Sequence, residues 1–180
     1  MTRFFAGFLT GTILLLLAAA AIAWLGLLYV RADAAVPPWF ASWFSASVRR
    51  SVARQAASVA APVPASQADV IAGGKLFVND CAGCHGEPGK PASDFGATFY
   101  PPAPQLALHG TSYSESQIFW IAKHGIRRTG MSAQSDSYSD EKLRLLAAFI
   151  SRIRTLPPEV IAALHEKSKP QPAESAAPKP

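Results

Sequence analysis

The stretch "FVNDCAGCHGEPGKP", residues 77–91, carries the strongest indication of fold and chemistry in this chain. It holds the chain's only two cysteines, Cys81 and Cys84, and His85 follows the second directly. Two thiols three positions apart, followed by an imidazole, are an unusual concentration of reactive side chains. The Gly/Pro-rich residues after them predict a loop rather than a continuing helix.

Four chemistries use closely spaced cysteines. A disulfide at this spacing closes a very small loop and adds little stability. A thiol redox pair usually lies in a βαβ pattern, and a structural zinc site needs four ligands, of which only two cysteines are available here. Covalent haem attachment needs this pentad: two thiols one helical turn apart bond the porphyrin edge, and His85 can bind the iron. We therefore favour haem.

The surrounding residues 68–156 predict an all-α domain. We expect helices over residues 68–79, 114–124 and 140–154. Ser114 and Gln117 form a capping-box pattern, Gly125 suits the position after a helix, and Ser139 caps the third helix. No alternating strand pair is visible. The apolar residues are few for a helical core, which suggests that a large apolar group fills the middle.

The N-terminal residues predict a membrane anchor. Residues 4–30 are 27 uncharged, mostly apolar residues, long enough to cross a hydrocarbon core of roughly 30 Å. Residues 1–35 are therefore expected to be one transmembrane helix and its flank. A cleaved signal is the alternative, since "ADA" at residues 32–34 has the small-x-small form of a cleavage site.

Residues 36–59 predict an amphipathic helix in the membrane interface. Phe40, Phe44, Val48 and Val52 recur every four residues, and tryptophans and arginines flank this stripe. A short helix packed on the soluble domain is the alternative. Residues 60–67 are a predicted linker that lets the domain swing, and residues 157–180 a short helix followed by a disordered Pro-rich tail.

The positive charge lies beside the apolar segment. The formal net charge is +5, of which residues 1–66 contribute five Lys/Arg and one Asp. This placement favours a lipid bilayer over nucleic acid as the partner of the basic residues.

A sixth iron ligand distinguishes electron transfer from ligand chemistry. Met131 is the only methionine besides Met1, and it lies in a Gly-containing loop between two predicted helices. We favour Met131, because methionine and histidine are an established axial pair. His109 is the main rival; His124 and His165 are expected to be surface residues.

These motifs resemble those of class I c-type cytochromes of the membrane-anchored bacterial monohaem type. The resemblance covers residues 68–156 and rests on "GGKLFVNDCAGCHG" (73–86), "PPAPQL" (101–106) and "RTGMSA" (128–133). It implies three main helices and long loops around one haem c per chain, covalently bound through Cys81 and Cys84, with His85 and Met131 on the iron.

The resemblance also implies supporting contacts. The carbonyl of Pro104 would accept the ring N–H of His85. Gly73 would let the first and last helices cross closely, against Phe149. Apart from the resemblance, Arg127 and Arg128 are candidate partners of the haem propionates, and two solvated surface arginines are the alternative.

The expected function is single-electron transfer between periplasmic or membrane redox partners, without enzymatic activity of its own. The resemblance places the haem domain on the outer side of a bacterial cytoplasmic membrane, although the basic residues after the span would favour the opposite orientation. The alternatives are a haem subunit of a dehydrogenase or oxidase complex, and a haem sensor or peroxidase with an open sixth site.

Overall fold

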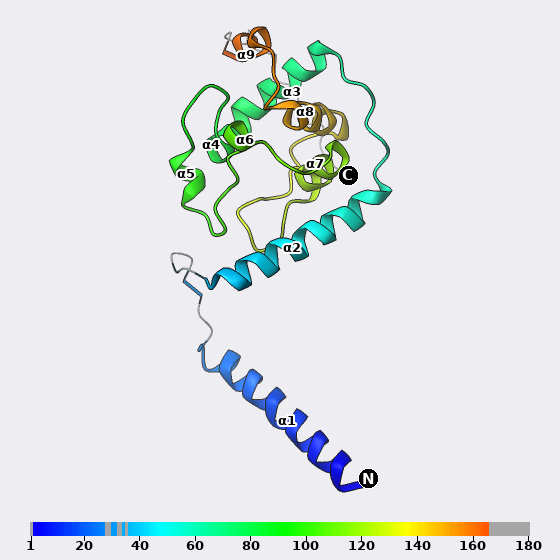
Figure 1. The fold of residues 1–180 in the computed structure, drawn as a ribbon, viewed down its shortest axis with the longest axis vertical. Helices are drawn as coiled ribbons and strands as arrows, with labels where there is room; N and C mark the ends of the chain where they lie inside the picture. The colour runs from blue at the N-terminus through cyan, green and yellow to red at the C-terminus, as the bar shows by residue number, and fades with distance from the viewer. Residues whose placement is uncertain (1, 28–29, 32–33, 35, 166–180) are drawn as a thin grey trace, which may run out of the picture. The chain divides into compact units, whose positions relative to one another are not determined.

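The computed structural model describes residues 2–27, 30, 31, 34 and 36–165. All regular secondary structure in these residues is helical (Figure 1). The chain divides into two compact units, Met1–Ala34 and Ala35–Pro180. The first unit holds α1 (Thr2–Trp24), and Arg3–Trp24 is long and apolar enough to cross a membrane, with a mean hydropathy of 2.2. A signal sequence near the N-terminus would meet the same description.

Three main helices build the second unit: α3 (Gln67–Asp80), α7 (Glu115–His124) and α8 (Asp140–Arg152). Each begins at a serine whose hydroxyl accepts a backbone N–H of the first turn. Ser114 and Gln117 form the predicted capping box, and Gly125 ends α7 with φ of 66°. These local signals lie within one turn of each helix end, which is why the sequence located the three helices to within two residues.

The close crossing of α3 and α8 forms the centre of the core. Phe77 and Phe149 are fully buried, with ring centroids 5.4 Å apart. A Cβ at Gly73 would overlap the carbonyl of Leu145, whereas a Cβ at Gly74 would lie 2.7 Å from the Phe149 ring. The prediction that Gly73 lies against Phe149 was therefore wrong by one residue, because Gly74 is the glycine at the ring. Gly73 lies against the α8 backbone, and Gly74 lies under the aromatic ring.

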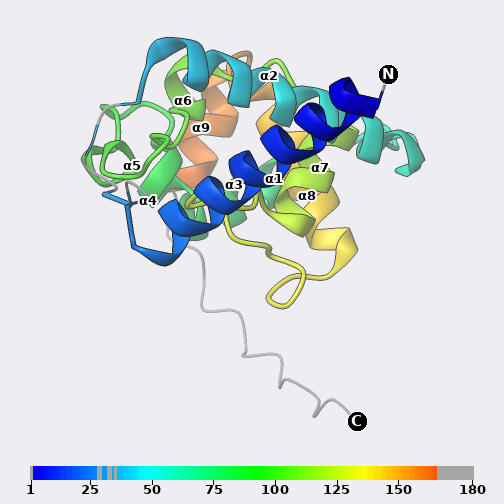
Figure 2. The same cartoon turned by 90° about the horizontal axis from the view of Figure 1, so that it is seen from below.

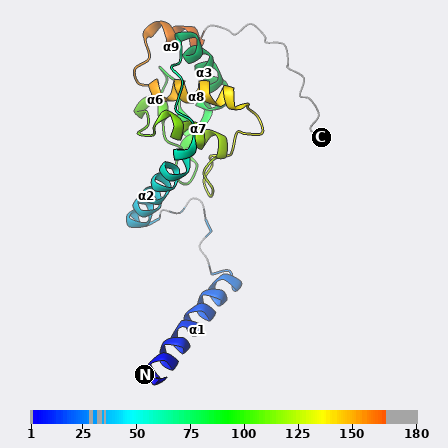
Figure 3. The same cartoon turned by 90° about the vertical axis from the view of Figure 1, so that its right-hand side faces the viewer.

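The remaining long helices extend the stack on both sides. The helix α9 (Pro158–His165) packs on α3, and its Val160 and Leu164 are buried. The helix α2 (Pro38–Gln55) leads into a short 3₁₀ helix, η1 (Ala56–Ser58), and both contact α7. Figure 3 shows the resulting order α9, α3, α8, α7, α2. The predicted disordered tail falls mainly on residues 166–180, outside the described residues.

The apolar stripe of α2 faces this domain. Phe44 and Val48 are half-buried, and Val52 is buried. The stripe that suggested a membrane interface in the sequence therefore packs on the soluble domain at its C-terminal end. This arrangement is the alternative considered above, since burial of Val52 against protein removes it from any bilayer contact.

Three one-turn helices lie together beside the stack: α4 (Ala82–His85), α5 (Asp94–Ala97) and α6 (Leu106–His109) (Figures 1 and 2). The contacts of α4 with α5 and α6 hold the long loop between α3 and α7 together, and α4 also contacts α3. The cysteine motif is on α4, so this loop positions one wall of the candidate site.

Candidate functional site

A cleft with a volume of about 340 Å³ opens between the main helices and the loops. Its walls bring Cys81, Cys84 and His85 together with Met131, which is 46 positions after His85 in the chain. Much of the rest of the wall is apolar: Phe77, Phe99, Pro101, Pro102, Ala103, Pro104, Leu106, Ile118, Ile121, Ala122, Ile126, Leu146 and Ile150. This is the environment that the sequence predicted for a large apolar group.

The two cysteines are one turn apart at the start of the cleft. Cys81 precedes α4, Cys84 lies within it, and the amide of Cys84 donates to the Cys81 carbonyl at 3.1 Å. Both are half-buried, with free thiols. Burial, aided by the negative charge of Asp80, raises the pKa of Cys81 to about 12. In the absence of a bound group, Cys81 is therefore a neutral thiol at neutral pH.

The described residues also contain no group of three or more His, Cys, Asp or Glu side chains that could hold a metal ion. The zinc interpretation therefore lacks, among the described residues, the four-ligand set that a structural zinc site needs.

A hydrogen bond from one ring nitrogen fixes the orientation of the His85 imidazole. Its Nδ1 lies 2.8 Å from the Pro104 carbonyl oxygen, so the contact expected from the resemblance is present. A carbonyl only accepts, so Nδ1 carries the proton and donates it. Burial lowers the pKa of His85, and the bond to Pro104 partly opposes this. The neutral ring therefore keeps a lone pair on Nε2, which is the form that binds metals.

A glutamine that the sequence analysis missed holds the loop of Pro104 in place. The amide nitrogen of Gln105 donates to the carbonyls of Cys84 at 3.0 Å and Ala103 at 3.1 Å. Its oxygen accepts the backbone N–H of Ser93 at 2.7 Å. Gln105 thus joins three loop segments around α4. Its position directly after Pro104 was the available signal.

The Met131 loop has its own internal hydrogen bonds. The Ile126 amide donates to the Met131 carbonyl at 2.9 Å, and the Met131 amide donates to Thr129 Oγ1 at 3.1 Å. Gly125 has a positive φ of 66°, and a Cβ there would lie 2.6 Å from the Met131 carbonyl. The half-buried Met131 is therefore fixed at the cleft by the end of α7.

The other candidate residues lie elsewhere. His109 at the end of α6 and His124 at the end of α7 are both exposed, and neither lines the cleft. His165 ends α9, and its side chain is outside the description. Arg127 and Arg128 are also exposed and do not line the cleft, so the structure brings neither into the site.

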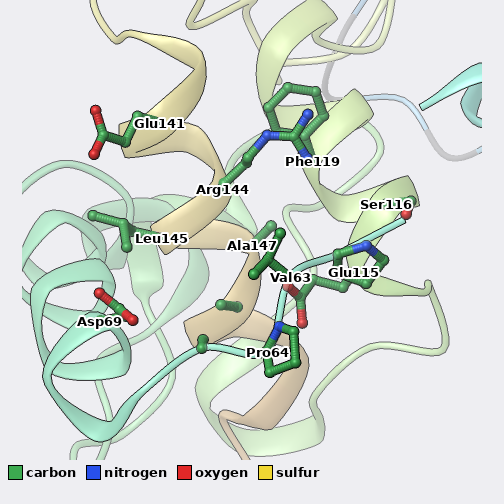
Figure 4. A pocket seen from close by; sticks show the side chains of 13 residues that line it. Val63, Pro64, Asp69, Glu115, Ser116, Phe119, Glu141, Arg144, Leu145 and Ala147 are labelled. Atoms are coloured by element: carbon green, nitrogen blue, oxygen red, sulfur yellow. The ribbon is translucent and has the colours of Figure 1, made fainter. Parts of the chain in front are cut away.

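A second, smaller pocket of about 170 Å³ lies between the 62–65 segment, α3, α7 and α8 (Figure 4). Here the guanidinium carbon of Arg144 lies 4.6 Å from the ring centroid of Phe119. No cysteine, histidine or methionine lines this pocket, and it shares no residue with the larger cleft. It therefore offers no comparable ligand set.

Comparison with known families agrees with the geometry. Residues 68–150 match the family model described as "Cytochrome C oxidase, cbb3-type, subunit III". The domain is a c-type cytochrome. The matched segment of this cytochrome includes α3, the cysteine motif, Pro104 and Met131, whereas α2 and α9 lie outside it. No solved structure matches the chain.

The cytochrome domain implies covalently bound haem c, and the residues of the cleft fit that group. Two free thiols are one turn apart, one imidazole has a free lone pair, and a thioether lines the same apolar cavity. An electron-transfer role follows from this class of domain.

Proposed function

We propose that this protein is a membrane-tethered monohaem cytochrome c that passes single electrons between redox partners in or at the membrane. The observation that carries the proposal is the presence of Cys81, Cys84, His85 and Met131 in one apolar cleft. The sequence contains one pair of cysteines, which supports one haem per chain.

Each residue has a distinct proposed role. Cys81 and Cys84 would hold the haem covalently, and His85 would bind its iron through Nε2 while the Pro104 carbonyl keeps the imidazole ring oriented. Met131 would be the second protein ligand of the iron and would keep small molecules off the metal. When bound, haem c supplies a one-electron ferrous/ferric couple. The apolar wall limits water access, and a soft thioether favours the ferrous state.

The proposed location is the outer side of a bacterial cytoplasmic membrane, with α1 as a single uncleaved span. The support is the length and hydropathy of Arg3–Trp24 and the family resemblance, since haem c is attached outside the cytoplasm. Protease added to spheroplasts would then digest the cytochrome domain. Digestion only in inverted vesicles would contradict this topology.

The ligand assignment is tested by replacing Met131 with alanine. We expect the variant to bind CO in the ferrous state, to lose the weak long-wavelength ferric absorption of an iron–sulfur bond, and to have a lower midpoint potential. His109→Ala is the matched control and should change none of these. Tight CO binding by the wild type would instead favour a haem sensor or peroxidase.

A second candidate function is a haem subunit of an oxidase complex, which the description of the matched family favours. The electron-transfer chemistry would be the same, and only the partner would differ. Co-purification of the detergent-extracted protein with membrane oxidase subunits would support this function. Purification as a single chain would support the independent carrier.

A further inference from the structure

The helix α2 has two different sides. Phe44, Val48 and Val52 face the cytochrome domain. Trp39, Trp43, Arg50 and Arg54 recur at intervals of four, seven and four residues, which places them together on the opposite side of a helix. We call these four residues the outer side of α2. All four are exposed, with 70% of Trp39 and 64% of Trp43 accessible.

The outer side has the composition of a membrane-interface surface. Two large aromatic rings lie in its N-terminal half and two arginines in its C-terminal half. Phe40 contacts both rings, at centroid distances of 5.8 Å from Trp39 and 6.0 Å from Trp43. Tryptophan favours the boundary between apolar tails and wet headgroups, because its ring is apolar and its N–H needs a partner.

The charged residues on the outer side of α2 are all positive. The sequence has no Asp or Glu between residues 34 and 68, whereas α2 carries Arg49, Arg50 and Arg54. Within the described part of the chain, neither Arg50 nor Arg54 has an ion-pair partner. An exposed basic and aromatic surface without acidic neighbours is complementary to anionic headgroups.

Chain continuity favours lipid over a soluble partner. Thirteen residues, 25–37, separate the end of α1 from the start of α2. A fully extended segment of that length reaches at most roughly 45 Å, at about 3.5 Å per residue. If α1 spans the bilayer, as in the proposed function, the headgroups stay within reach of α2 at all times.

We propose that the outer side of α2 docks on anionic lipid headgroups and so fixes the orientation of the cytochrome domain on the membrane. This inference rests on the membrane tether in the proposed function. The helix α2 contacts α7, and Val52 on its other side is buried. Pro62, Val63 and Pro64 of the predicted linker line the small pocket on the domain. Docking of α2 would therefore orient the whole domain on the membrane instead of leaving it to swing on the 60–67 segment.

The test uses the full-length, haem-loaded protein in lipid nanodiscs. Because Cys81 and Cys84 are consumed in thioether bonds, an introduced cysteine is the one reactive thiol. Ser47→Cys lies four residues after Trp43 and is exposed, so a spin label there reports on the outer side without removing a docking group. Ala162→Cys on α9, at the far end of the stack, is the matched control.

In nanodiscs containing phosphatidylglycerol, the label at residue 47 should become more accessible to oxygen and less accessible to a water-soluble nickel reagent. Phosphatidylcholine discs should give a smaller change, and the label at residue 162 should not respond. Replacing Arg50 and Arg54 with glutamine should lower the ratio of docked to free domain roughly thirtyfold, since each basic residue near anionic headgroups contributes a factor of about five. Replacing Arg127 and Lys142, which removes the same charge elsewhere, should leave it unchanged.

Three results would overturn the inference in distinguishable ways. Unchanged accessibility at residue 47 in protein that has entered the discs would refute docking and leave the tether intact. Protection that arises only on adding a purified membrane complex would assign the surface to a protein partner and refute lipid. Failure of the full chain to enter discs would refute the tether of the proposed function, and this inference with it.

Discussion

Replacing Gly73 with alanine tests the helix crossing on which the haem cleft is built. A Cβ at residue 73 would overlap the Leu145 carbonyl and lie 3.1 Å from the Leu146 nitrogen. Both atoms belong to the α8 backbone, which cannot move aside as a flexible side chain can. Overpacking of this kind costs about 1–3 kcal/mol, and the rigid neighbour favours the upper end. Alanine offsets roughly 1 kcal/mol through its greater helix propensity.

The expected net loss in the free energy of unfolding is therefore about 2 kcal/mol. Gly83→Ala is the matched control, because a Cβ there meets nothing within 4 Å and the residue lies in α4. It should be neutral or more stable by up to about 1 kcal/mol. Guanidinium unfolding of the haem-loaded proteins, followed by circular dichroism and by haem absorbance, measures both. Equal shifts in the two variants would refute the close crossing of α3 and α8.

Three further predictions concern the loop, a helix cap and the haem attachment. Gln105→Leu removes the hydrogen bonds to the carbonyls of Cys84 and Ala103. It should lower the free energy of unfolding in guanidinium by about 1–3 kcal/mol. The hydrogen bonds from Ser66 lower the pKa of Asp69. The stability that Asp69 contributes is therefore present above its unfolded pKa of about 4, and it is lost as pH falls through the lower folded pKa. The stability of Asp69→Asn should consequently fall less than that of the wild type between pH 7 and pH 3, as measured by unfolding. Wild-type haem should remain on the chain through acid and organic extraction, whereas replacing both Cys81 and Cys84 with alanine should abolish this.

Each of these has a clear contrary result. Wild-type stability of Gln105→Leu would show that the Pro104 loop does not depend on that side chain. An Asp69→Asn variant with the same acid sensitivity as the wild type would show that the capping box does not cause the loss of stability in acid. Quantitative haem release from the wild type would exclude covalent attachment.

Much of the cytochrome domain could be predicted because its signals are local. The serine caps of α7 and α8 and the spacing of Cys81, Cys84 and His85 each lie within about one helical turn. Met131 was placed near His85 because it is the only methionine besides Met1 and because methionine and histidine are an established axial pair. No local pattern in the chain would have given their proximity.

The missed features depend on tertiary contacts. The sequence does not distinguish Gly73 from Gly74, because which glycine meets Phe149 depends on the rotation of α3 against α8. The apolar stripe of α2 could equally face a bilayer or a protein surface, and only the packing of Val52 decides between them. Gln105 is an ordinary loop residue until its three hydrogen-bonded segments are brought together.

The most direct test of the account is an NMR spectrum of the ferrous protein labelled with ¹³C at the methionine methyl groups. The sequence has two methionines, Met1 and Met131, so Met1, where it is retained, provides an internal reference. If Met131 binds the iron, its methyl group lies over the porphyrin ring, and the ring current shifts its signal far upfield of the reference. That shifted signal should be absent in Met131→Ala and unchanged in His109→Ala. Methionine methyl signals only at ordinary positions in the wild-type protein would contradict the proposed ligation by Met131.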